Sequence, residues 1–374
     1  MKKRLGIYLH IPFCVQKCRY CDFCSFADRH GEYVEKYVAA LCNSISSYAS
    51  RLEDYEADTV YFGGGTPSFL SAGQIERIMN TLENAVCISP SAEITLECNP
   101  ATADRRYFDD IRKMGVNRLS MGLQSASDDE LALLGRIHTA EDFVKTYLDA
   151  RAAGFDNISA DLMYGIPSQT PDSLERSLRF LCALEPEHIS AYGLTVEDGT
   201  YFARHRAELD LADDDMQAQM YLACGRILSE YGYEKYEVSN FAKEGKVSRH
   251  NVRYWRCDEY LGFGVAAHSY FGGERFGNSR DIDAFILGND ITEERATVDD
   301  RERAVEYVML GLRLTEGIDA CTYRSKFGRE LMRDIPRAQE YVKNGFMTYE
   351  GGVLKFTDKG FLVSNAILSD ILSF

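Results

Sequence analysis

The sequence predicts an α/β protein whose first 200 residues form a partial, open (β/α)6 barrel. Three observations predict this fold. Short runs rich in β-branched or aromatic residues alternate with longer amphipathic segments from residue 1 to about residue 200. Such alternation is typical of parallel strands that are joined by crossover helices. Six strand candidates are too few for an eight-stranded barrel, so we expect the barrel to stay open.

The strand candidates are short, and most are followed by Gly, Pro or polar residues, as strand ends usually are. In chain order they are Gly6–Leu9, Thr59–Phe62, Ile94–Glu97, Arg118–Met121, Ile158–Leu162 and His188–Tyr192. The segments between them place apolar residues at helical spacing. These helix candidates are Tyr33–Leu52, Gln74–Asn84, Asp104–Met114, Glu141–Ala153 and Ser173–Leu184.

The remaining chain changes character twice, so we expect three regions: 1–200, 201–295 and 296–374. The second region combines a helix candidate, Asp214–Tyr231, with aromatic and Gly-rich segments, and we expect it to cover the open side of the barrel. The third is a C-terminal α+β region. It contains the helix candidate Arg301–Leu314 and the pair Gly351-Gly352, which predicts a hairpin turn between two short strands. Helices followed by a hairpin predict a winged-helix-like module.

Charge and hydropathy exclude several classes of protein. The 42 basic and 58 acidic residues give a net charge of −16, which disfavours nucleic acid as a partner. No uncharged apolar run approaches the ~18 residues of a transmembrane helix, which leaves only a peripheral membrane contact open. His10 and Pro12 interrupt the apolar start, so it does not resemble a signal peptide. We therefore expect a cytoplasmic protein.

The strongest chemical signal is the loop Cys14-Val-Gln-Lys-Cys18-Arg-Tyr-Cys21, directly after the first strand candidate. Three thiolates at this spacing can hold three irons of an iron–sulfur cube and leave the fourth iron open. The alternative is a zinc site that Cys24 completes, or a chance group of buried cysteines. The other cysteines of the chain are more simply explained as core residues.

Polar residues also follow three other strand candidates. Glu97, Gln124 and Asp161 each lie at or near a strand end, and such ends converge on one site in α/β barrels. A further strand ends in Gly63-Gly64-Gly65, where the backbone can approach a ligand without hindrance from a Cβ atom. Taken one at a time, each polar residue is more simply a helix cap or a surface ion pair.

The CxxxCxxC pattern, with the aromatic Tyr20 before its third cysteine, resembles the radical S-adenosylmethionine (SAM) superfamily. The resemblance implies that Cys14, Cys18 and Cys21 hold a [4Fe–4S] cluster whose open iron chelates SAM. It also implies that an electron from the cluster cleaves SAM. The residues that it assigns to SAM are Tyr8, Gly64, Gly65, Thr66, Glu97, Gln124, Arg136 and Asp161, with the Arg136 fork suited to the SAM carboxylate.

Five motifs narrow the resemblance to the oxygen-independent coproporphyrinogen III oxidase group, and within it to the HemW branch of haem chaperones. In order, they are Tyr8-Leu-His10-Ile-Pro-Phe-Cys14, Gly63-Gly-Gly-Thr-Pro-Ser68, Glu97-Cys-Asn-Pro100, Ser120-Met-Gly-Leu-Gln-Ser125 and Asp161-Leu-Met-Tyr-Gly-Ile-Pro167. The oxidases continue the cysteine motif as CxxxCxxCxC and carry an extension before it. Here Phe23 replaces that last cysteine, and the first cysteine is already residue 14. Both departures favour the HemW branch.

The second half contains His250-Asn-Val-Arg-Tyr254-Trp255, an HNxxYW pattern that resembles the same branch. The resemblance favours His250 as the axial ligand of haem, because neutral imidazole is a common haem ligand. His268, His10 or a cysteine are the alternatives. The simpler explanation is that this aromatic segment packs the second half against the barrel.

Three functions follow from these observations. The first is a haem chaperone that uses a cluster and SAM, and that needs a haem-accepting protein and an electron donor as partners. The second is an oxygen-independent coproporphyrinogen III oxidase, and the third is another radical SAM enzyme that modifies a tetrapyrrole. Phe23 favours the first of these.

Overall fold

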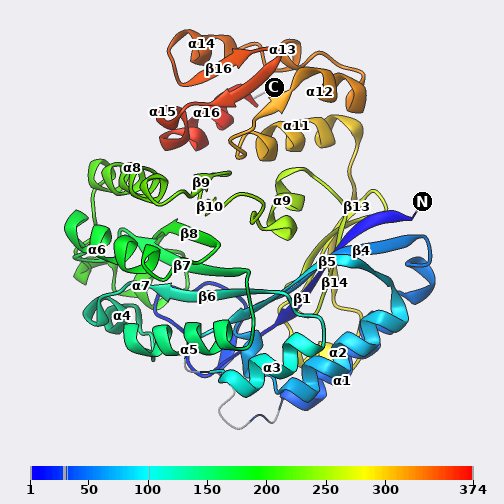
Figure 1. Cartoon of the computed structure of the whole chain (residues 1–374). Coiled ribbons are helices and arrows are strands. Elements are labelled where there is room, and N and C mark those ends of the chain that lie inside the picture. The colour runs from blue at the N-terminus through cyan, green and yellow to red at the C-terminus, as the bar shows by residue number, and fades with distance from the viewer. Residues whose placement is uncertain (1, 28–30, 32, 101, 373–374) are drawn as a thin grey trace.

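The computed structural model describes residues 2–27, 31, 33–100 and 102–372, and its first 193 residues form an open barrel (Figure 1). Six strands lie side by side and run parallel: β1 (Lys3–Ile11), β4 (Tyr55–Gly64), β5 (Cys87–Cys98), β6 (Arg118–Gln124), β7 (Ile158–Tyr164) and β8 (His188–Gly193). The structure thus confirms the expected α/β class and all six strand candidates.

Helices cover the outer face of this sheet (Figure 1). They are α1 (Val34–Ser47), α2 (Ala72–Ala85), α3 (Arg105–Lys113), α4 (Asp128–Leu134), α5 (Ala140–Ala152) and α6 (Pro171–Cys182). Two of them begin at a capping box, in which Ser71 pairs with Gln74 and Thr139 pairs with Asp142. Only α4, a short helix, was absent from the sequence expectation.

The two faces of the barrel sheet differ in polarity. On β6, Leu119, Met121 and Leu123 are fully buried in the core that the sheet forms with the helices. The residues that alternate with them, Arg118 and Ser120, line a cavity inside the barrel. Because successive strand residues point to opposite faces, a polar interior and an apolar exterior are built from the same strands.

The segment from 201 to 297 lengthens the sheet at both of its edges. It contains α7 (Tyr201–Arg204), α8 (Asp214–Glu230), β9 (Glu234–Lys235), β10 (Asn240–Ala242), α9 (Arg249–Trp255), β11 (Tyr260–Phe263), β12 (His268–Phe271), β13 (Glu274–Asn278), α10 (Ile282–Ile286) and β14 (Thr292–Thr297). Strand β10 pairs antiparallel with β8, and β11 pairs parallel with β1. The result is one sheet of 12 strands among the described residues.

The last part of the chain forms a module with its own hydrophobic core, drawn in orange and red in Figure 1. Its elements are α11 (Asp300–Gly311), β15 (Ile318–Asp319), α12 (Ala320–Phe327), α13 (Leu331–Asp334), α14 (Ala338–Lys343), β16 (Met347–Glu350), β17 (Val353–Phe356), α15 (Asp358–Leu362) and α16 (Ser364–Ile371). Gly351 and Gly352 join β16 to β17 with φ angles of 60° and 85°, which a two-residue hairpin turn requires. The expected helices and hairpin are present, in the element order of a winged helix.

Within the described part of the chain, we find no helix with the length and apolar composition that crossing a membrane requires.

Candidate functional site

A closed loop carries the three clustered cysteines at the carboxyl end of β1. Strand β2 (Phe13–Cys14) pairs with β3 (Phe26–Ala27), so the two ends of the loop are held together. The middle of the loop is fixed from the other side, because the Arg19 N–H donates to the carbonyl of Leu134 at 3.0 Å. This loop therefore has a defined shape although it contains little regular structure.

The structure brings Cys14, Cys18 and Cys21 to the wall of one cavity of about 140 Å³. Cys24 is buried and does not line this cavity; its carbonyl is hydrogen-bonded to Nε2 of His10 at 2.8 Å. The arrangement supports the assignment of three cysteines, not four, to a metal centre.

The donor set at this cavity fits an iron–sulfur cluster. Cysteine thiolates are the usual ligands of such clusters. Among the described residues, no three His, Cys, Asp or Glu side chains converge closely enough to hold a single metal ion. Polar groups also approach the sulfurs: Thr66 Oγ1 donates to Cys14 Sγ at 3.4 Å, and Arg136 Nη1 donates to Cys18 Sγ at 3.5 Å.

Seven of the eight residues that the resemblance assigns to SAM line the same cavity. They are Gly64, Gly65, Thr66, Glu97, Gln124, Arg136 and Asp161. Tyr8, the eighth, is not among the lining residues; its half-buried side chain stacks on the ring of Tyr61, and its hydroxyl is hydrogen-bonded to His10 Nδ1 at 3.1 Å. Tyr8 therefore lies behind the cavity wall.

The glycine turn at the end of β4 packs closely against the backbone that precedes Cys14. Gly64 has a φ of 115°, a conformation that residues with a Cβ atom rarely adopt. A Cβ atom on Gly65 would lie 2.8 Å from the carbonyl oxygen of Phe13, directly before the first cysteine. The close approach of the Phe13 backbone thus explains Gly65, whereas a Cβ atom on Gly64 would lie 2.6 Å from the His10 ring.

Two carboxyl groups in the cavity have pKa values that burial raises toward neutral pH. Glu97 accepts hydrogen bonds from the Tyr61 hydroxyl at 2.9 Å and from the Gly64 N–H at 3.1 Å. Burial nevertheless raises the pKa of Glu97 to about 7, and burial raises the pKa of Asp161 to about 6. Both can therefore exchange a proton near physiological pH, and their free lone pairs can accept hydrogen bonds from hydroxyl or ammonium groups.

Asn99 joins these groups, although the sequence analysis gave it no role. Its amide nitrogen donates to Thr66 Oγ1 at 2.8 Å, and its amide oxygen accepts from Arg136 Nη2 at 2.9 Å. Together with the contacts to sulfur, these bonds form a chain from Cys14 to Cys18. The position of Asn99 two residues after Glu97, in the same motif, was the available signal.

The residues of the HNxxYW pattern lie on α9, at the opposite end of the barrel. His250 is 1% exposed, and its ring nitrogens are hydrogen-bonded to Thr59 Oγ1 and to the Tyr254 hydroxyl, each at 2.8 Å. Burial lowers the pKa of His250 to about 3, so the ring is neutral. Neither nitrogen is free for iron in this arrangement. Ligation of haem by His250 therefore stays a prediction that requires Thr59 or Tyr254 to release the ring.

The sequence left His10, His268 or an unspecified cysteine as alternative haem ligands, and these lie in different surroundings. His10 is buried and has hydrogen bonds at both ring nitrogens, to Tyr8 and to the Cys24 carbonyl. His268 is exposed at the start of β12. Cys257, which follows α9, lines a cleft of about 940 Å³ between α9 and the C-terminal module.

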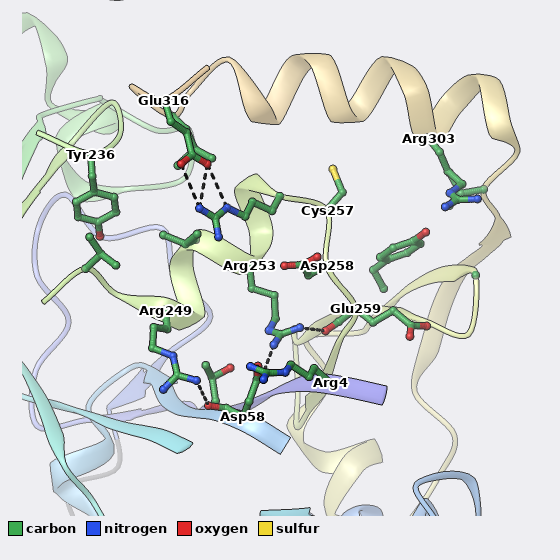
Figure 2. Close-up of a pocket in the computed structure, with 18 of the residues that line it drawn as sticks. Arg4, Asp58, Tyr236, Arg249, Arg253, Cys257, Asp258, Glu259, Arg303 and Glu316 are labelled. Carbon is green, nitrogen blue, oxygen red and sulfur yellow. Dashed lines mark hydrogen bonds and ion pairs between the residues drawn. The ribbon is translucent and has the colours of Figure 1, made fainter. Parts of the chain in front are cut away.

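Figure 2 shows this cleft, with Arg249 and Arg253 of α9 along it. Arg256, directly after α9, also lines the cleft. Arg253 pairs with Asp58 and donates to the Glu259 carbonyl at 3.1 Å. Arg256 is held by Glu316 on the opposite side. The side of α9 that faces the cleft is thus basic, whereas the His250 side chain points into the barrel.

A third cavity, of about 480 Å³, fills the barrel interior. It shares Tyr20, Glu97, Gln124 and Asp161 with the cavity at the cysteine loop, so the two spaces are neighbours. Arg118, His188 and Asn251 line it farther from the cysteines. The sequence analysis named Arg118 and His188 only as strand residues.

Comparisons with known proteins agree with this geometry. Residues 8–181 match the radical SAM superfamily, and residues 298–363 match the HemN C-terminal domain. The chain is 33% identical to heme chaperone HemW of Bacillus subtilis, over 98% of each chain. It is also 33% identical to heme chaperone HemW of Escherichia coli, over 99% of this chain and 98% of the relative.

One solved structure has the same fold over the whole chain. It is the coproporphyrinogen III oxidase HemN of Escherichia coli, a radical SAM enzyme, which superimposes with a TM-score of 0.87. The alignment covers 100% of this chain and 91% of the oxidase, at 23% sequence identity. This similarity supports the open barrel with its C-terminal module, and it concerns the fold alone.

Proposed function

Because the chain belongs to the HemW family of heme chaperones and carries a radical SAM domain, we propose that it binds haem and transfers it to an acceptor protein. The observation that carries this proposal is the 33% identity over 98% of both this chain and its relative from Bacillus subtilis. Similarity over the full length includes the barrel, the HNxxYW helix and the C-terminal module together. The radical SAM domain implies a [4Fe–4S] cluster and SAM as cofactors.

We assign the cluster to Cys14, Cys18 and Cys21. When bound, the cluster supplies an electron and an open iron for the amino and carboxylate groups of SAM. The support is the convergence of the three thiols on one cavity, together with the contacts of Thr66 and Arg136 to two of the sulfurs. The chain of hydrogen bonds through Asn99 keeps these two polar residues in place.

We assign SAM to the seven of these residues that line this cavity, while Tyr8 stacks on Tyr61 outside the cavity wall. Gly64 and Gly65 provide backbone groups that SAM can approach closely. Glu97 and Asp161 provide acceptors for hydroxyl or ammonium hydrogens. Arg136 offers its fork to a carboxylate. Its Nη2 already donates to the Asn99 amide oxygen and to the Gly122 carbonyl, so its side chain is oriented before a ligand arrives.

We propose that haem binds beside α9. His250 is the ligand that the HNxxYW pattern favours, and Cys257 is the alternative that the cleft offers. Arg249 and Arg256 line that cleft and can pair with carboxylates such as the haem propionates. Haem titration of His250→Ala and Cys257→Ser separates the two ligands, since imidazole and thiolate give different Soret bands. If both variants keep the wild-type haem spectrum and affinity, neither residue is the ligand.

The oxidase function is not favoured. Phe23, which stands where the oxidases carry a fourth cysteine, is 68% exposed at the mouth of the cluster cavity. Incubation of the reconstituted protein with coproporphyrinogen III, SAM and a reductant tests this function, and we expect no decarboxylated product.

We further propose an electron donor as a partner and the cytoplasm as the location. A cluster that acts on SAM needs a source of electrons, and Phe23 and Ile137 expose apolar surface beside the cysteine loop. Thiols that are reserved for a cluster suit a reducing compartment.

A further inference from the structure

Arg256 and Glu316 form an ion pair across the cleft beside α9 (Figure 2). Arg256 directly follows α9, whereas Glu316 lies on the C-terminal module, in the turn between α11 and β15. Arg256 Nε and Nη2 donate to Glu316 Oε1 at 3.2 Å and 3.0 Å, and Nη2 also donates to Oε2 at 3.2 Å. A guanidinium fork binds any carboxylate in this way, so Glu316 occupies the side of Arg256 that a ligand carboxylate would use.

This pair can open at little cost. The side chains of Arg256 and Glu316 are 52% and 56% exposed, and exposed ion pairs contribute little to stability. The backbone beside Glu316 is held by other bonds, because the Thr315 N–H donates to the Tyr236 carbonyl at 3.0 Å and Thr315 Oγ1 donates to the Lys235 carbonyl at 3.1 Å. The Glu316 side chain can therefore leave Arg256 while the turn that carries it stays in place.

Arg249 is a second cation of the cleft that is available to an anion. Its guanidinium donates to the backbone carbonyls of Ser91 at 2.8 Å and Asp58 at 3.3 Å, and in the described part of the chain it has no carboxylate side chain within ion-pair distance. The other arginines that line the cleft, Arg256 apart, each have a carboxylate partner: Arg4 and Arg253 pair with Asp58, and Arg303 pairs with Asp300.

The spacing of Arg249 and Arg256 suits a ligand with two carboxylates. The two residues are seven positions apart, which is about two helical turns and roughly 10 Å along the axis of α9, so they lie on the same side of the helix. Haem carries two propionates at one edge of the porphyrin. One of them can pair with Arg249, while the other meets Glu316 at Arg256.

We infer that Glu316 competes with a haem propionate for Arg256, so that it lowers the affinity of the cleft for haem. In the haem-free protein the Glu316 carboxylate stands in for the propionate, and haem binding displaces it. Such competition suits a protein that must release its haem to an acceptor. The inference rests on the proposed function, with haem in the cleft beside α9.

The test uses the full chain with its cluster reconstituted, and it measures the haem dissociation constant from the Soret band. We expect Glu316→Gln to bind haem about two- to fivefold more tightly than the wild type, the range that an exposed ion pair supplies. In the Arg256→Gln background, where there is no cation to compete for, we expect Glu316→Gln to give no gain.

Two controls separate this competition from a looser C-terminal module. Asp358→Asn removes the ion pair of Asp358 with Lys235 at 2.6 Å, which also joins the module to the barrel side, and neither residue lines the cleft. We expect its haem affinity to equal that of the wild type. The second control is the dimethyl ester of haem, which has no propionate charges, and we expect Glu316→Gln and the wild type to bind it equally.

The inference is overturned if Glu316→Gln binds haem no more tightly than the wild type, or if its gain persists in the Arg256→Gln background. It is also overturned if Asp358→Asn or the dimethyl ester shows the same gain. In each of these outcomes the wild type still binds haem, so the proposed function stands. A wild-type protein that binds no haem would overturn the proposed function, and this inference with it.

Discussion

The ring of His250 lies against the ring of Tyr61, with 5.1 Å between the centroids and 26° between the planes. The hydroxyl of the same tyrosine donates to Glu97, which lines the SAM cavity. One side chain therefore joins the HNxxYW helix at one end of the barrel to the cofactor cavity at the other. A shift of His250 would therefore move Tyr61 and, through its hydroxyl, affect Glu97.

Replacement of Tyr61 by Phe tests this connection. The Tyr61 hydrogen bond holds down the pKa of Glu97, which burial raises to about 7. Without that bond the pKa rises further, so Glu97 is protonated at neutral pH and accepts fewer hydrogen bonds from SAM. We expect SAM affinity at pH 7 to fall about two- to tenfold. SAM affinity rises as Glu97 loses its proton, and we expect the midpoint of that rise to move to higher pH.

Calorimetric titration of SAM between pH 6 and pH 8.5 measures both effects. Tyr107→Phe is the control, because the Tyr107 hydroxyl is also buried but has no hydrogen-bond partner among the residues that the structure describes. An unchanged pH profile in Tyr61→Phe would show that Glu97 does not contribute through its charged form.

Replacement of Cys14, Cys18 or Cys21 by Ser should remove most of the iron, because each thiol lines the cluster cavity. Cys24→Ser should keep the wild-type iron content, since Cys24 does not line that cavity. Iron analysis and EPR after anaerobic reconstitution compare the four variants. Equal losses in all four would contradict the assignment of three ligands.

Gly65→Ala should disturb the cluster through the backbone before the first cysteine. Its Cβ atom would lie 2.8 Å from the Phe13 carbonyl oxygen, so the backbone before Cys14 must shift. We expect reduced iron content and weaker SAM binding.

Gly73→Ala in α2 is the matched control, because nothing lies within 4 Å of its added Cβ atom. Alanine is a better helix former than glycine, so this variant should gain about 0.5 kcal/mol of stability and keep its cluster. Identical iron contents in the two variants would show that the cysteine loop tolerates the shift.

Glu237→Gln should stabilise the protein, and it should do so more at pH 8 than at pH 5. Burial raises the pKa of Glu237 to about 7, and its Oε2 has no hydrogen-bond partner among the described residues. A raised carboxyl pKa favours the folded state below the unfolded-state value of 4.5, and this contribution is lost as the pH rises through 7. The neutral variant should therefore gain up to about 3 kcal/mol at pH 8, and the gain should shrink toward pH 5.

Urea unfolding at the two pH values measures this difference. A gain of the same size at both would mean that the charge of Glu237 is not its cause.

The sequence predicted the barrel strands well because most of them carry β-branched or aromatic residues between glycine or polar breaks. It did not predict that β11 pairs with β1, in a register that places Tyr260 beside Gly6. This contact joins segments far apart in the chain, and the short strand β11 carries two aromatic residues and a glycine without alternation. No local pattern specifies such a partner.

The site was predictable to a similar extent. Strand ends converge in a parallel barrel, which explains why Glu97, Gln124 and Asp161 meet at one cavity. The face of a seven-residue helix is harder to infer, and the sequence could not tell that His250 points into the barrel instead of the cleft. Arg118 did leave a signal, since a charged residue begins a strand that is buried along its whole length.

Haem binding and transfer by the reconstituted protein, measured in the same anaerobic sample as coproporphyrinogen III turnover, tests the central claim most directly. The account predicts a stoichiometric Soret band on haem titration, passage of that haem to an acceptor apoprotein, and no decarboxylated product. A protein that binds no haem and decarboxylates coproporphyrinogen III would contradict it.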